Sequence, residues 1–345
     1  MSGTASWRRS VLRLIGRPWG VAMINVIDFE DVREILGSLS PLDMLAWVEW
    51  CFEHKRDFQM PAKIRLSQPR GDYYACMPCM HEGLDFAIAK MVGRHVEANR
   101  SEGLPPMTSD VLCYHASSGK LRALVDGEYV TTVRTGACAA HSALLYAVRG
   151  FETVGLIGLG NIMTSFMDVL ATAVAGRHLT VKLYRHNGQE CRFVERFAGF
   201  DNLRFEFCDS YEEVADGTDL IVSAVTRAEG DFCDPSFYKR GCTIIPIMTL
   251  GFQGCDTRFD KVFTDEVEQI RGFKFFNEFK SVANTDDVLM GNAPGRESDD
   301  ERILVYNYGL ASLDLLFIYK LLELDCEDGA SCIRYRPCSE RYFMG

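Results

Sequence analysis

The fold is decided by residues 153–166, which read TVGLIGLGNIMTSF. The apolar run 154–157 predicts a buried strand, and it passes through Gly158-Leu-Gly160 into a segment with helical apolar spacing. A strand that turns through glycines into a helix brings backbone N–H groups and a helix N-terminus against a dinucleotide pyrophosphate. Gly158 would permit the tight turn, and Gly160 would let the phosphates approach without a Cβ in the way. Met163 stands at the third glycine position of this fingerprint, so the motif alone is incomplete.

Strand and helix patterns continue to alternate for more than a hundred residues after this turn. Further strands are predicted at residues 179–184, 203–208, 219–225, 243–248 and 261–264, with helices near 190–197 and 211–215. Such alternation predicts a doubly wound parallel sheet, which is a Rossmann-type α/β domain. A doubly wound domain can also bind another ligand or none, but the glycine turn favours a dinucleotide. The residues expected at its phosphates are Gly158, Gly160, Asn161, Ile162 and Met163.

Residues 24–150 lack this alternation and predict an α+β domain. Ser40 and Pro41 are typical of a helix N-cap and first turn. Alternating runs follow at residues 73–77, 85–91, 111–116 and 121–125, with turns at 117–119 and 126–127. The segment 303–324 reads as one long apolar helix that returns to this domain. We therefore expect an α+β domain of residues 23–150 and 304–325, a Rossmann domain of residues 151–303, and a C-terminal tail of residues 326–345.

Bulk properties exclude several functions. The 345 residues suggest about two domains, and the net charge of −11 argues against a nucleic-acid surface. No window approaches the length of a membrane span. The 13 cysteines are scattered through apolar runs, which predicts reduced thiols in a cytoplasmic protein. Residues 1–22 carry four arginines and no acid, which fits a targeting helix or a disordered extension.

Two groups of cysteines invite a metal or redox interpretation. Cys76 and Cys79 lie near His81, and a second group comprises Cys326, Cys332 and Cys338. Neither group has a second ligand pair at zinc spacing, so we expect no metal site.

Four basic residues stand where a merely solvated charge is not expected. Lys90 interrupts the apolar run 86–92, and Arg134 lies at the junction of a predicted strand with a small-residue helix. Lys63 and Arg65 flank Ile64 after a proline. Cations that face a cleft suit a substrate carboxylate, and arginine can bind one with two parallel hydrogen bonds. Salt bridges or solvated side chains are the alternative explanation.

From about residue 28 to 324 the chain resembles the ornithine cyclodeaminase/mu-crystallin family. The matching segments are 61–66, 77–78, 89–92, 118–127, 133–137, the glycine turn, 294–298, 307–311 and Asp314. The resemblance implies a Rossmann domain joined to an α+β domain that binds substrate and builds a homodimer. It implies that Lys90 and Arg134 bind the substrate α-carboxylate, with Arg65 joining them and Lys63 as the competing alignment. It further implies that Ser223, Ala224, Val225 and Thr226 border the cofactor.

The chain departs from this family pattern in two places. Cyclodeaminases carry an Asp soon after the fifth Rossmann strand, where it handles protons on the substrate nitrogen. Here residues 247–252 read IMTLGF, and Asp256 and Asp260 do not match cleanly. The reductase members also lack that Asp, so the departure favours them. At the end of the second Rossmann strand, Arg185 replaces the acid that would mark NAD, which favours NADP.

These features predict an NAD(P)-dependent oxidoreductase that acts at the Cα–N bond of a small amino acid or its imine. Lys90, Arg134 and Arg65 are the expected catalytic and substrate-binding residues, with Lys63 as a further binding residue. One alternative is cyclodeaminase-type conversion of a diamino acid to a cyclic product with ammonia release. A second is a non-catalytic protein that binds NADP(H) and a small ligand. The substrate side chain and the proton donor are not identified by the sequence.

Overall fold

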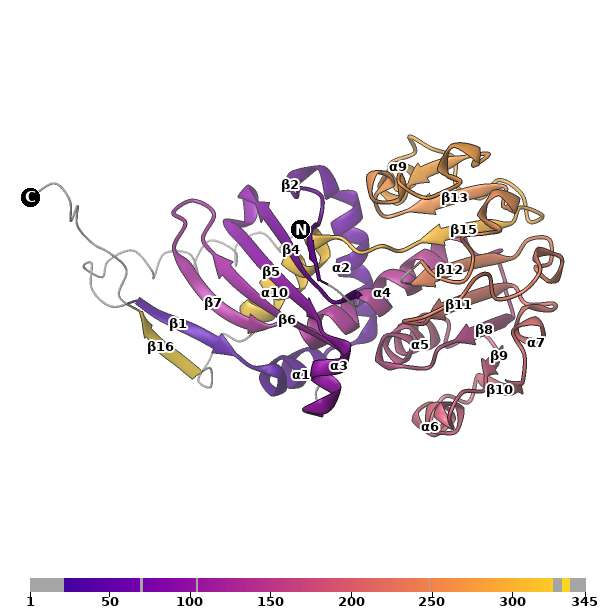
Figure 1. Cartoon of the computed structure of the whole chain (residues 1–345), viewed down its shortest axis with the longest axis horizontal. Coiled ribbons are helices and arrows are strands. Elements are labelled where there is room, and N and C mark those ends of the chain that lie inside the picture. Colours follow the sequence, from indigo (N-terminus) through magenta and orange to yellow (C-terminus); the bar gives the residue numbers. More distant parts are fainter. Residues whose placement is uncertain (1–21, 69–70, 104, 248, 325–330, 336–345) are drawn as a thin grey trace, which may run out of the picture.

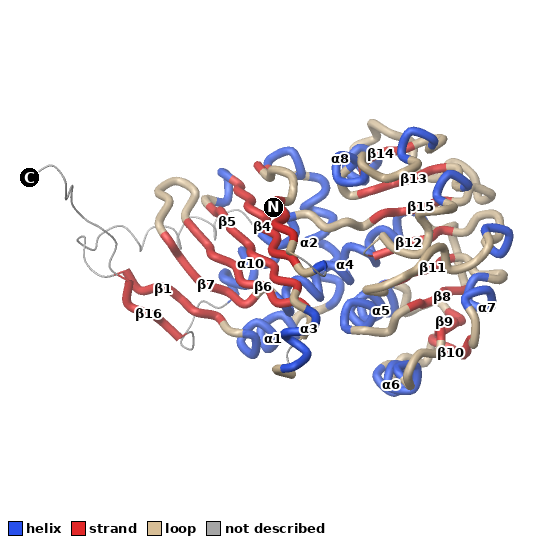
Figure 2. The backbone as a smooth tube through the Cα atoms, viewed as in Figure 1, coloured by secondary structure: helices blue, strands red, loops and turns tan. Residues whose placement is uncertain are grey.

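The computed structural model describes residues 22–68, 71–103, 105–247, 249–324 and 331–335, and in it the chain forms two sheets with helices between them (Figures 1 and 2). The first sheet has the strand order β16-β1-β7-β6-β5-β4-β2, and β3 pairs with β4. Its pairs are antiparallel except β1 with β7. Its strands are β1 (Ala22–Ile27), β2 (Phe58–Gln59), β3 (Ile64–Ser67), β4 (Tyr73–His81), β5 (Phe86–Arg94), β6 (Met107–Tyr114), β7 (Leu121–Asp126) and β16 (Ser331–Tyr335).

The second sheet is parallel and has the order β10-β9-β8-β11-β12-β15-β13-β14. Its strands are β8 (Thr153–Ile157), β9 (Leu179–Tyr184), β10 (Leu203–Cys208), β11 (Leu220–Ala224), β12 (Thr243–Ile247), β13 (Lys261–Thr264), β14 (Val282–Asn284) and β15 (Ile303–Tyr306). The strand order reverses between β8 and β11, which defines the switch point where doubly wound folds bind ligands. The predicted Rossmann-type sheet is therefore confirmed.

Helices cover both faces of the second sheet and one face of the first. They are α1 (Phe29–Gly37), α2 (Pro41–Glu53), α3 (Val96–Ser101), α4 (Glu128–Tyr146), α5 (Asn161–Ala173), α6 (Gln189–Arg196), α7 (Tyr211–Ala215), α8 (Val267–Ile270), α9 (Thr285–Leu289) and α10 (Ala311–Leu324). The Ser40 hydroxyl caps α2 and Pro41 opens it, as predicted. Among the described residues, no helix is long and apolar enough to cross a membrane.

Alternation along the buried strands divides the interior into two hydrophobic cores. Val154, Leu156 and Val222 point into the larger core, which is continuous with the first sheet. Ile157 and Ile221 point to the opposite face, where a smaller core is closed by α7 and the segments that follow β11 and β12. A strand covered on both faces must be apolar at every position, which explains the uninterrupted apolar runs in the sequence.

Helix α4 connects the two halves of the molecule (Figure 1). It packs against α2 and α10 on one side and against α5 and β12 on the other. Gly136 makes this packing close, because an added Cβ would lie 2.5 Å from the Ser165 hydroxyl and 2.6 Å from the Phe166 amide nitrogen. The residues at the start of α4 are thereby held in a fixed position between the first sheet and the Rossmann domain.

The C-terminal part of the chain differs from prediction. Residues 303–306 are not helical; they form β15 inside the second sheet, so this strand lies beyond the boundary expected at residue 303. Three of the four residues in the segment ILVY are β-branched or aromatic, and Gly309 with φ 97° separates it from α10. Helix α10 does return to the first sheet, against β4 and β5, as predicted. Within the expected tail, residues 331–335 form β16 on the edge of β1, whereas residues 1–21 lie outside the described part.

Candidate active site

The glycine turn between β8 and α5 has the geometry that dinucleotide binding requires. Gly158 has φ 86°, and a Cβ there would lie 2.5 Å from the Ala224 carbonyl oxygen at the end of β11. Gly160 is the N-cap of α5, has no side-chain cap, and faces open space, since an added Cβ would meet nothing within 4 Å. Asn161 and Ile162 form the first helical turn, while Met163 is fully buried in the core. The free N–H groups of α5 are therefore available to an anion.

Two polar side chains at the same edge of the sheet have an unused hydrogen-bonding atom. The Ser223 hydroxyl, at the end of β11, is fully buried and has no partner among the described residues. Asn307 follows β15 and is 5% exposed; its Oδ1 accepts a hydrogen bond from Ser142, while its Nδ2 has no partner in the described part of the chain. Buried polar atoms are almost always paired, so these two fit the polar groups of a bound cofactor.

The remaining predicted cofactor residues also lie at this edge. Ala224 and Val225 flank the Gly158 turn, and Thr226 follows them at the surface. Arg185 follows β9 and is about half exposed, with its Nη1 2.9 Å from Asp209 and its guanidinium 5.2 Å from the centre of the Phe207 ring. The Arg185 side chain is thus near the second strand of the sheet, as predicted, but already has an anionic partner.

Lys90 and Arg134 meet at one buried carboxylate, that of Asp314 on α10. The Lys90 ammonium, 1% exposed, donates to Asp314 Oδ1 at 2.8 Å and to the Thr131 hydroxyl at 2.6 Å. Arg134 Nε donates to the same Oδ1 at 3.0 Å. Burial lowers the pKa of Lys90 to about 8, although the adjacent Asp314 carboxylate opposes that shift. The nearby cations hold the pKa of Asp314 below its usual value despite its burial.

Arg134 lies inside α4, and the expectation of a strand-to-helix junction at this residue was wrong. Residues 131–133 are helical because α4 begins at Glu128, directly after Gly127. Only the Nε of Arg134 has a hydrogen-bond partner among the described residues, so both terminal nitrogens remain available. Gly309 lies in front of them, since a Cβ there would be 2.9 Å from Arg134 Nη1. The guanidinium therefore offers the two parallel donors that bind a carboxylate.

A cavity of about 280 Å³ adjoins this guanidinium. Gly309 lies between the guanidinium and this cavity, which we call the Lys63 cavity. Its lining includes Met60, Lys63, Met77, Gln269, Gly309 and Leu310, together with Glu266 and Glu268, which pair with Lys55 and Arg271. Lys63 is an exposed residue, but desolvation of its ammonium and the Arg134 charge lower its pKa. Arg65 lies on the same face of the first sheet as Ala75 and Met77, but its guanidinium is 4.0 Å from the centre of the Tyr73 ring and it does not line the cavity. Lys63 therefore lines the cavity beside Arg134, whereas Arg65 stacks on Tyr73 and lies near Lys63 without lining the cavity.

The carboxylates after β12 lie away from the Lys63 cavity. Asp256 is buried in the smaller core, where it accepts a hydrogen bond from the Tyr306 hydroxyl and burial raises its pKa to about 6. Asp260 binds Lys280 at 2.9 Å and the Arg302 amide at 3.0 Å. Neither residue lines the Lys63 cavity. The proton-handling Asp of cyclodeaminases therefore has no counterpart from these two residues.

The side chains of the first cysteine group do not come together on one face of β4. Strand β4 alternates, so Cys79 and His81 point into the core while Cys76 points to the other face of the sheet. Among the described residues, no cluster of three or more metal-binding side chains occurs. Of the second group, Cys326 and Cys338 lie outside the described residues.

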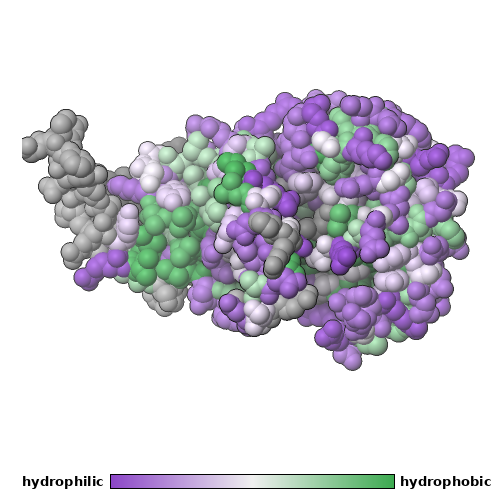
Figure 3. Space-filling model, viewed as in Figure 1, coloured by the Kyte–Doolittle hydropathy of each residue, from purple (hydrophilic) through white to green (hydrophobic). Residues whose placement is uncertain are grey.

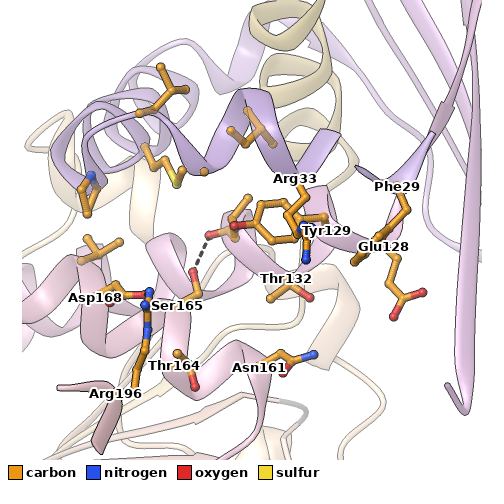
Figure 4. A pocket seen from close by; sticks show the side chains of 17 residues that line it. Phe29, Arg33, Glu128, Tyr129, Thr132, Asn161, Thr164, Ser165, Asp168 and Arg196 are labelled. Atoms are coloured by element: carbon orange, nitrogen blue, oxygen red, sulfur yellow. Dashed lines mark hydrogen bonds and ion pairs between the residues drawn. The ribbon is translucent and has the colours of Figure 1, made fainter. Parts of the chain in front are cut away.

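A larger cleft, of about 540 Å³, lies between α1, α4 and α5 (Figure 4). Tyr129 and Asn161 line it, and its two arginines are paired, since Arg196 binds Asp168 at 3.2 Å and Arg33 binds Glu30. Asn161 is thus the one expected phosphate-binding residue that also borders this cleft. A cleft whose two arginines both have acidic partners is less suited to a substrate carboxylate than the Lys63 cavity.

Sequence reasoning missed the roles of three residues at this site. Asp314 was only the last position of the family resemblance, Asn307 only part of a matching segment, and Gly309 was not singled out. The signal for Asp314 was an acid inside the apolar helix 311–324, which requires a buried cationic partner. That partner could not be named, because β5, α4 and α10 are far apart in sequence.

Comparison with known proteins agrees with the fold. Residues 26–247 match the model of the ornithine cyclodeaminase/mu-crystallin family. Alanine dehydrogenase of Archaeoglobus fulgidus is 33% identical over 272 residues, which cover 74% of this chain and 81% of that protein. The structure of an archaeal alanine dehydrogenase dimer with bound NAD superposes with a TM-score of 0.78 at 21% identity and covers 91% of this chain and all of that one. Thermococcus litoralis Δ1-pyrroline-2-carboxylate reductase, solved with NADH and L-proline, gives 0.76 at 18% identity and covers 87% of this chain and 97% of that one.

This chain belongs to the ornithine cyclodeaminase/mu-crystallin family. The family membership and the fold make it an NAD(P)-dependent enzyme of the imine and amino-acid oxidoreductase type.

Proposed function

We propose that this enzyme interconverts a small amino acid and its imine by hydride transfer at Cα, with the substrate carboxylate held by Arg134 in the Lys63 cavity. The observation that carries this proposal is the Arg134 guanidinium, which is buried, held at Nε, and without a partner at either terminal nitrogen in the part of the chain that the structure describes. Lys63 adds a second cation at the cavity wall. A cavity of this size suits a small amino acid and not a larger metabolite.

Lys90 is proposed to handle the proton on the substrate nitrogen. An ammonium has three N–H donors, and Asp314 and Thr131 use two of those of Lys90. A pKa of about 8 lets this group give or accept a proton near neutral pH. Lys90 can also assist Arg134 at the carboxylate, and both roles place the substrate carbon in a fixed position, which is positioning catalysis.

The cofactor is proposed to lie along the carboxyl edge of the second sheet. The α5 N-terminus at Gly160 would bind the pyrophosphate, and Ser223 with Asn307 would bind polar groups nearer the substrate. When bound, the nicotinamide supplies or accepts the hydride. Arg185 would bind a 2′-phosphate, which supports NADP over NAD.

A cyclodeaminase reaction has weaker support. Residues 249–252 contain no carboxylate, and Asp256 is committed to Tyr306 in the smaller core. An oxidoreductase needs only hydride transfer and one proton, which the residues around the Lys63 cavity can provide. The test must therefore distinguish an oxidoreductase from a cyclodeaminase and from a non-catalytic binding protein.

The test is a substrate screen with the purified full-length protein. Amino acids with NAD or NADP, and pairs of 2-keto acids or cyclic imines with the reduced cofactors, are followed at 340 nm. Stoichiometric change in reduced cofactor supports the proposal. Ammonia release from ornithine or lysine without net change at 340 nm would replace it with the cyclodeaminase, and binding without turnover of any pair would replace it with the binding protein.

A homodimer is proposed through the outer face of the first sheet. Ile64, Leu66, Tyr74, Met91 and Leu112 are between 37% and 65% exposed and lie on this face, where the space-filling view shows a hydrophobic patch (Figure 3). Exposed apolar patches of this kind mark protein interfaces. We expect light scattering to give a dimer mass, and Leu66→Asp to give a folded monomer. A monomeric unmodified protein at micromolar concentration would refute this interface.

A further inference from the structure

One carboxylate oxygen serves two buried cations in this site. Asp314 Oδ1 accepts hydrogen bonds from both Lys90 and Arg134, while Oδ2 has no partner among the described residues. Asp314 and Lys90 are almost completely buried, and the Arg134 side chain is 8% exposed. Lys63 adds a third cation to this cluster, and the fully buried Asp265 adds a second carboxylate that interacts with Arg134 and Lys63. Three cations against two carboxylates leave one excess positive charge. Such an excess is costly unless a ligand compensates it.

The way in which Asp314 binds Arg134 leaves the excess charge facing the Lys63 cavity. Asp314 binds the inner Nε, so the guanidinium is held from behind and its two terminal nitrogens point toward Gly309. Gly309 lines the cavity, as does Met77, which is the cross-strand partner of Lys90. If the Asp314 carboxylate bound the two terminal nitrogens of Arg134 and not Nε, it would occupy the donors that face the cavity and block the site.

We propose that Asp314 is a positioning residue that holds Arg134 and Lys90 and reduces their charge to a single positive charge, matched to a ligand with one carboxylate. This inference rests on the proposed function for the place of the substrate. It assigns the uncompensated charge to the ligand. The ligand carboxylate completes a neutral cluster of three cations (Lys63, Lys90 and Arg134) and three anions (Asp265, Asp314 and the ligand). Asp314 itself does not contact the substrate.

The charge of Asp314 also controls the protonation of Lys90. The groups that face the Lys90 ammonium are Asp314 from α10, Arg134 and Thr131 from α4, and Lys63 from the segment before β3. Of these, Asp314 alone is anionic and stabilises the charged form. Removal of its charge must lower the pKa of Lys90, and an opposite charge at this distance typically shifts a pKa by about 1–3 units.

The experiment measures the pH dependence of carboxylate binding to the protein saturated with reduced cofactor. Calorimetry with L-proline, L-alanine and acetate covers pH 6 to 9.5 for the unmodified protein, Asp314→Asn, and the control Asp286→Asn. Asp286 is a buried acid that binds Lys55 at 2.7 Å outside the site. Affinity should fall as the pH rises through the pKa of Lys90. The midpoint of that fall should move down by at least about one pH unit in Asp314→Asn and stay unchanged in Asp286→Asn.

A double variant keeps the test valid if Asp314→Asn does not fold. Lys90→Met with Asp314→Asn removes one cation and one anion together, so the net buried charge is preserved. We expect this variant to bind acetate without a pH-dependent fall between pH 6 and 9.5. A midpoint that is unchanged in Asp314→Asn, or a fall that persists in the double variant, would overturn the role of Asp314. If the unmodified protein binds none of the three carboxylates, the proposed function fails instead.

Discussion

Arg134 and Arg296 both lie in segments that resemble the same family, yet the structure uses them in opposite ways. Arg296 is bonded through every nitrogen of its guanidinium: it donates to the carbonyl oxygens of Tyr146, Ser298, Glu301 and Gly241 and to the Thr243 hydroxyl. The Arg296 side chain lies next to Thr243 at the start of β12, on the edge of the second sheet opposite to the glycine turn. Arg134 donates only through Nε within the described part of the chain.

The difference shows how a structural cation can be distinguished from a ligand-binding one. A buried cation with all donors used has no capacity for a ligand, whereas one with unused donors requires a further partner. Lys261 is a structural cation like Arg296, because its ammonium binds the Gly295 carbonyl oxygen and the carboxylates of Glu297 and Glu301. The N-terminus of α5 resembles Arg134 in having unused donors, because Gly160 leaves its N–H groups without a side-chain cap. Arg134 and the N-terminus of α5, which are the two positions expected to bind ligands, thus combine a fixed geometry with unused hydrogen-bond donors.

The largest expected effect is at the glycine turn. Gly160→Val should abolish dinucleotide binding and leave the fold intact, because the branched side chain fills space that is open in the protein and required by the pyrophosphate. Calorimetry with NADPH and NADH measures the binding. Gly199→Val is the control, since Gly199 also faces open space and lies outside the site. Retained cofactor affinity in Gly160→Val would refute the site.

The two arginines should separate activity from stability. Arg134→Met should lower kcat/KM by roughly 30- to several-thousandfold, which corresponds to about 2–5 kcal/mol, and leave cofactor affinity nearly unchanged. Arg296→Met should instead lower the free energy of unfolding by about 3 kcal/mol, because several carbonyl oxygens lose a charged donor. Steady-state kinetics and urea unfolding measure both quantities in both variants. If Arg134→Met loses stability and its folded fraction keeps full activity, Arg134 is structural.

The nucleotide half of the molecule could be predicted from sequence because its signals are local. Alternating apolar runs gave the strands from 154 to 264 within a few residues, and the turn at Gly158 was confirmed by its positive φ. Local patterns failed where tertiary pairing decides. Residues 303–306 continue an apolar run that fits a helix, but they pair with β12 and β13. Residues 131–133 are β-branched and fit a strand, but packing of α4 against α5 makes them helical.

The substrate half could be predicted only in part. Lys90 was recognisable as a charge inside an apolar strand, and strand alternation places it on the buried face with Ile88 and Val92. Its partner lies 224 residues further along the chain, so no spacing rule could reveal the pair. The choice between Lys63 and Arg65 also required the structure, since two cations on either side of Ile64 cannot be told apart by residue type, and only the structure shows that Lys63 lines the cavity while Arg65 stacks on Tyr73.

A smaller effect is expected from Gly309, which leaves room for the Arg134 guanidinium. Gly309→Ala places a Cβ 2.9 Å from Nη1, so the flexible side chain shifts and the fold survives. We expect kcat/KM to fall about tenfold, the effect of losing about 1.4 kcal/mol of transition-state stabilisation. Gly291→Ala is matched, because Gly291 also has positive φ (73°) but no atom within 4 Å of the added Cβ. Equal losses of activity in both variants would attribute the effect to backbone strain alone.

The smallest effect is expected at Arg185, an exposed arginine with a single acidic partner. The unmodified protein should prefer NADP to NAD, and Arg185→Asp should reverse or remove that preference. A charge-assisted bond to the 2′-phosphate contributes about 1.5–3 kcal/mol, while the exposed pair with Asp209 that it replaces contributes about 0–1 kcal/mol. After screening at this exposed position the net preference is about a few-fold, and it should diminish with salt.

Asp209→Asn sharpens this last prediction, because it changes the partner and leaves Arg185 in place. With its acidic partner gone, Arg185 has no competing anion, and the region loses a negative charge close to the expected phosphate. We expect NADP affinity to rise a few-fold while NAD affinity stays constant, measured by quenching of protein fluorescence at low ionic strength. Equal affinities for the two cofactors in the unmodified protein, unaltered by either substitution, would mean that Arg185 only stacks on Phe207 and takes no part in cofactor selection.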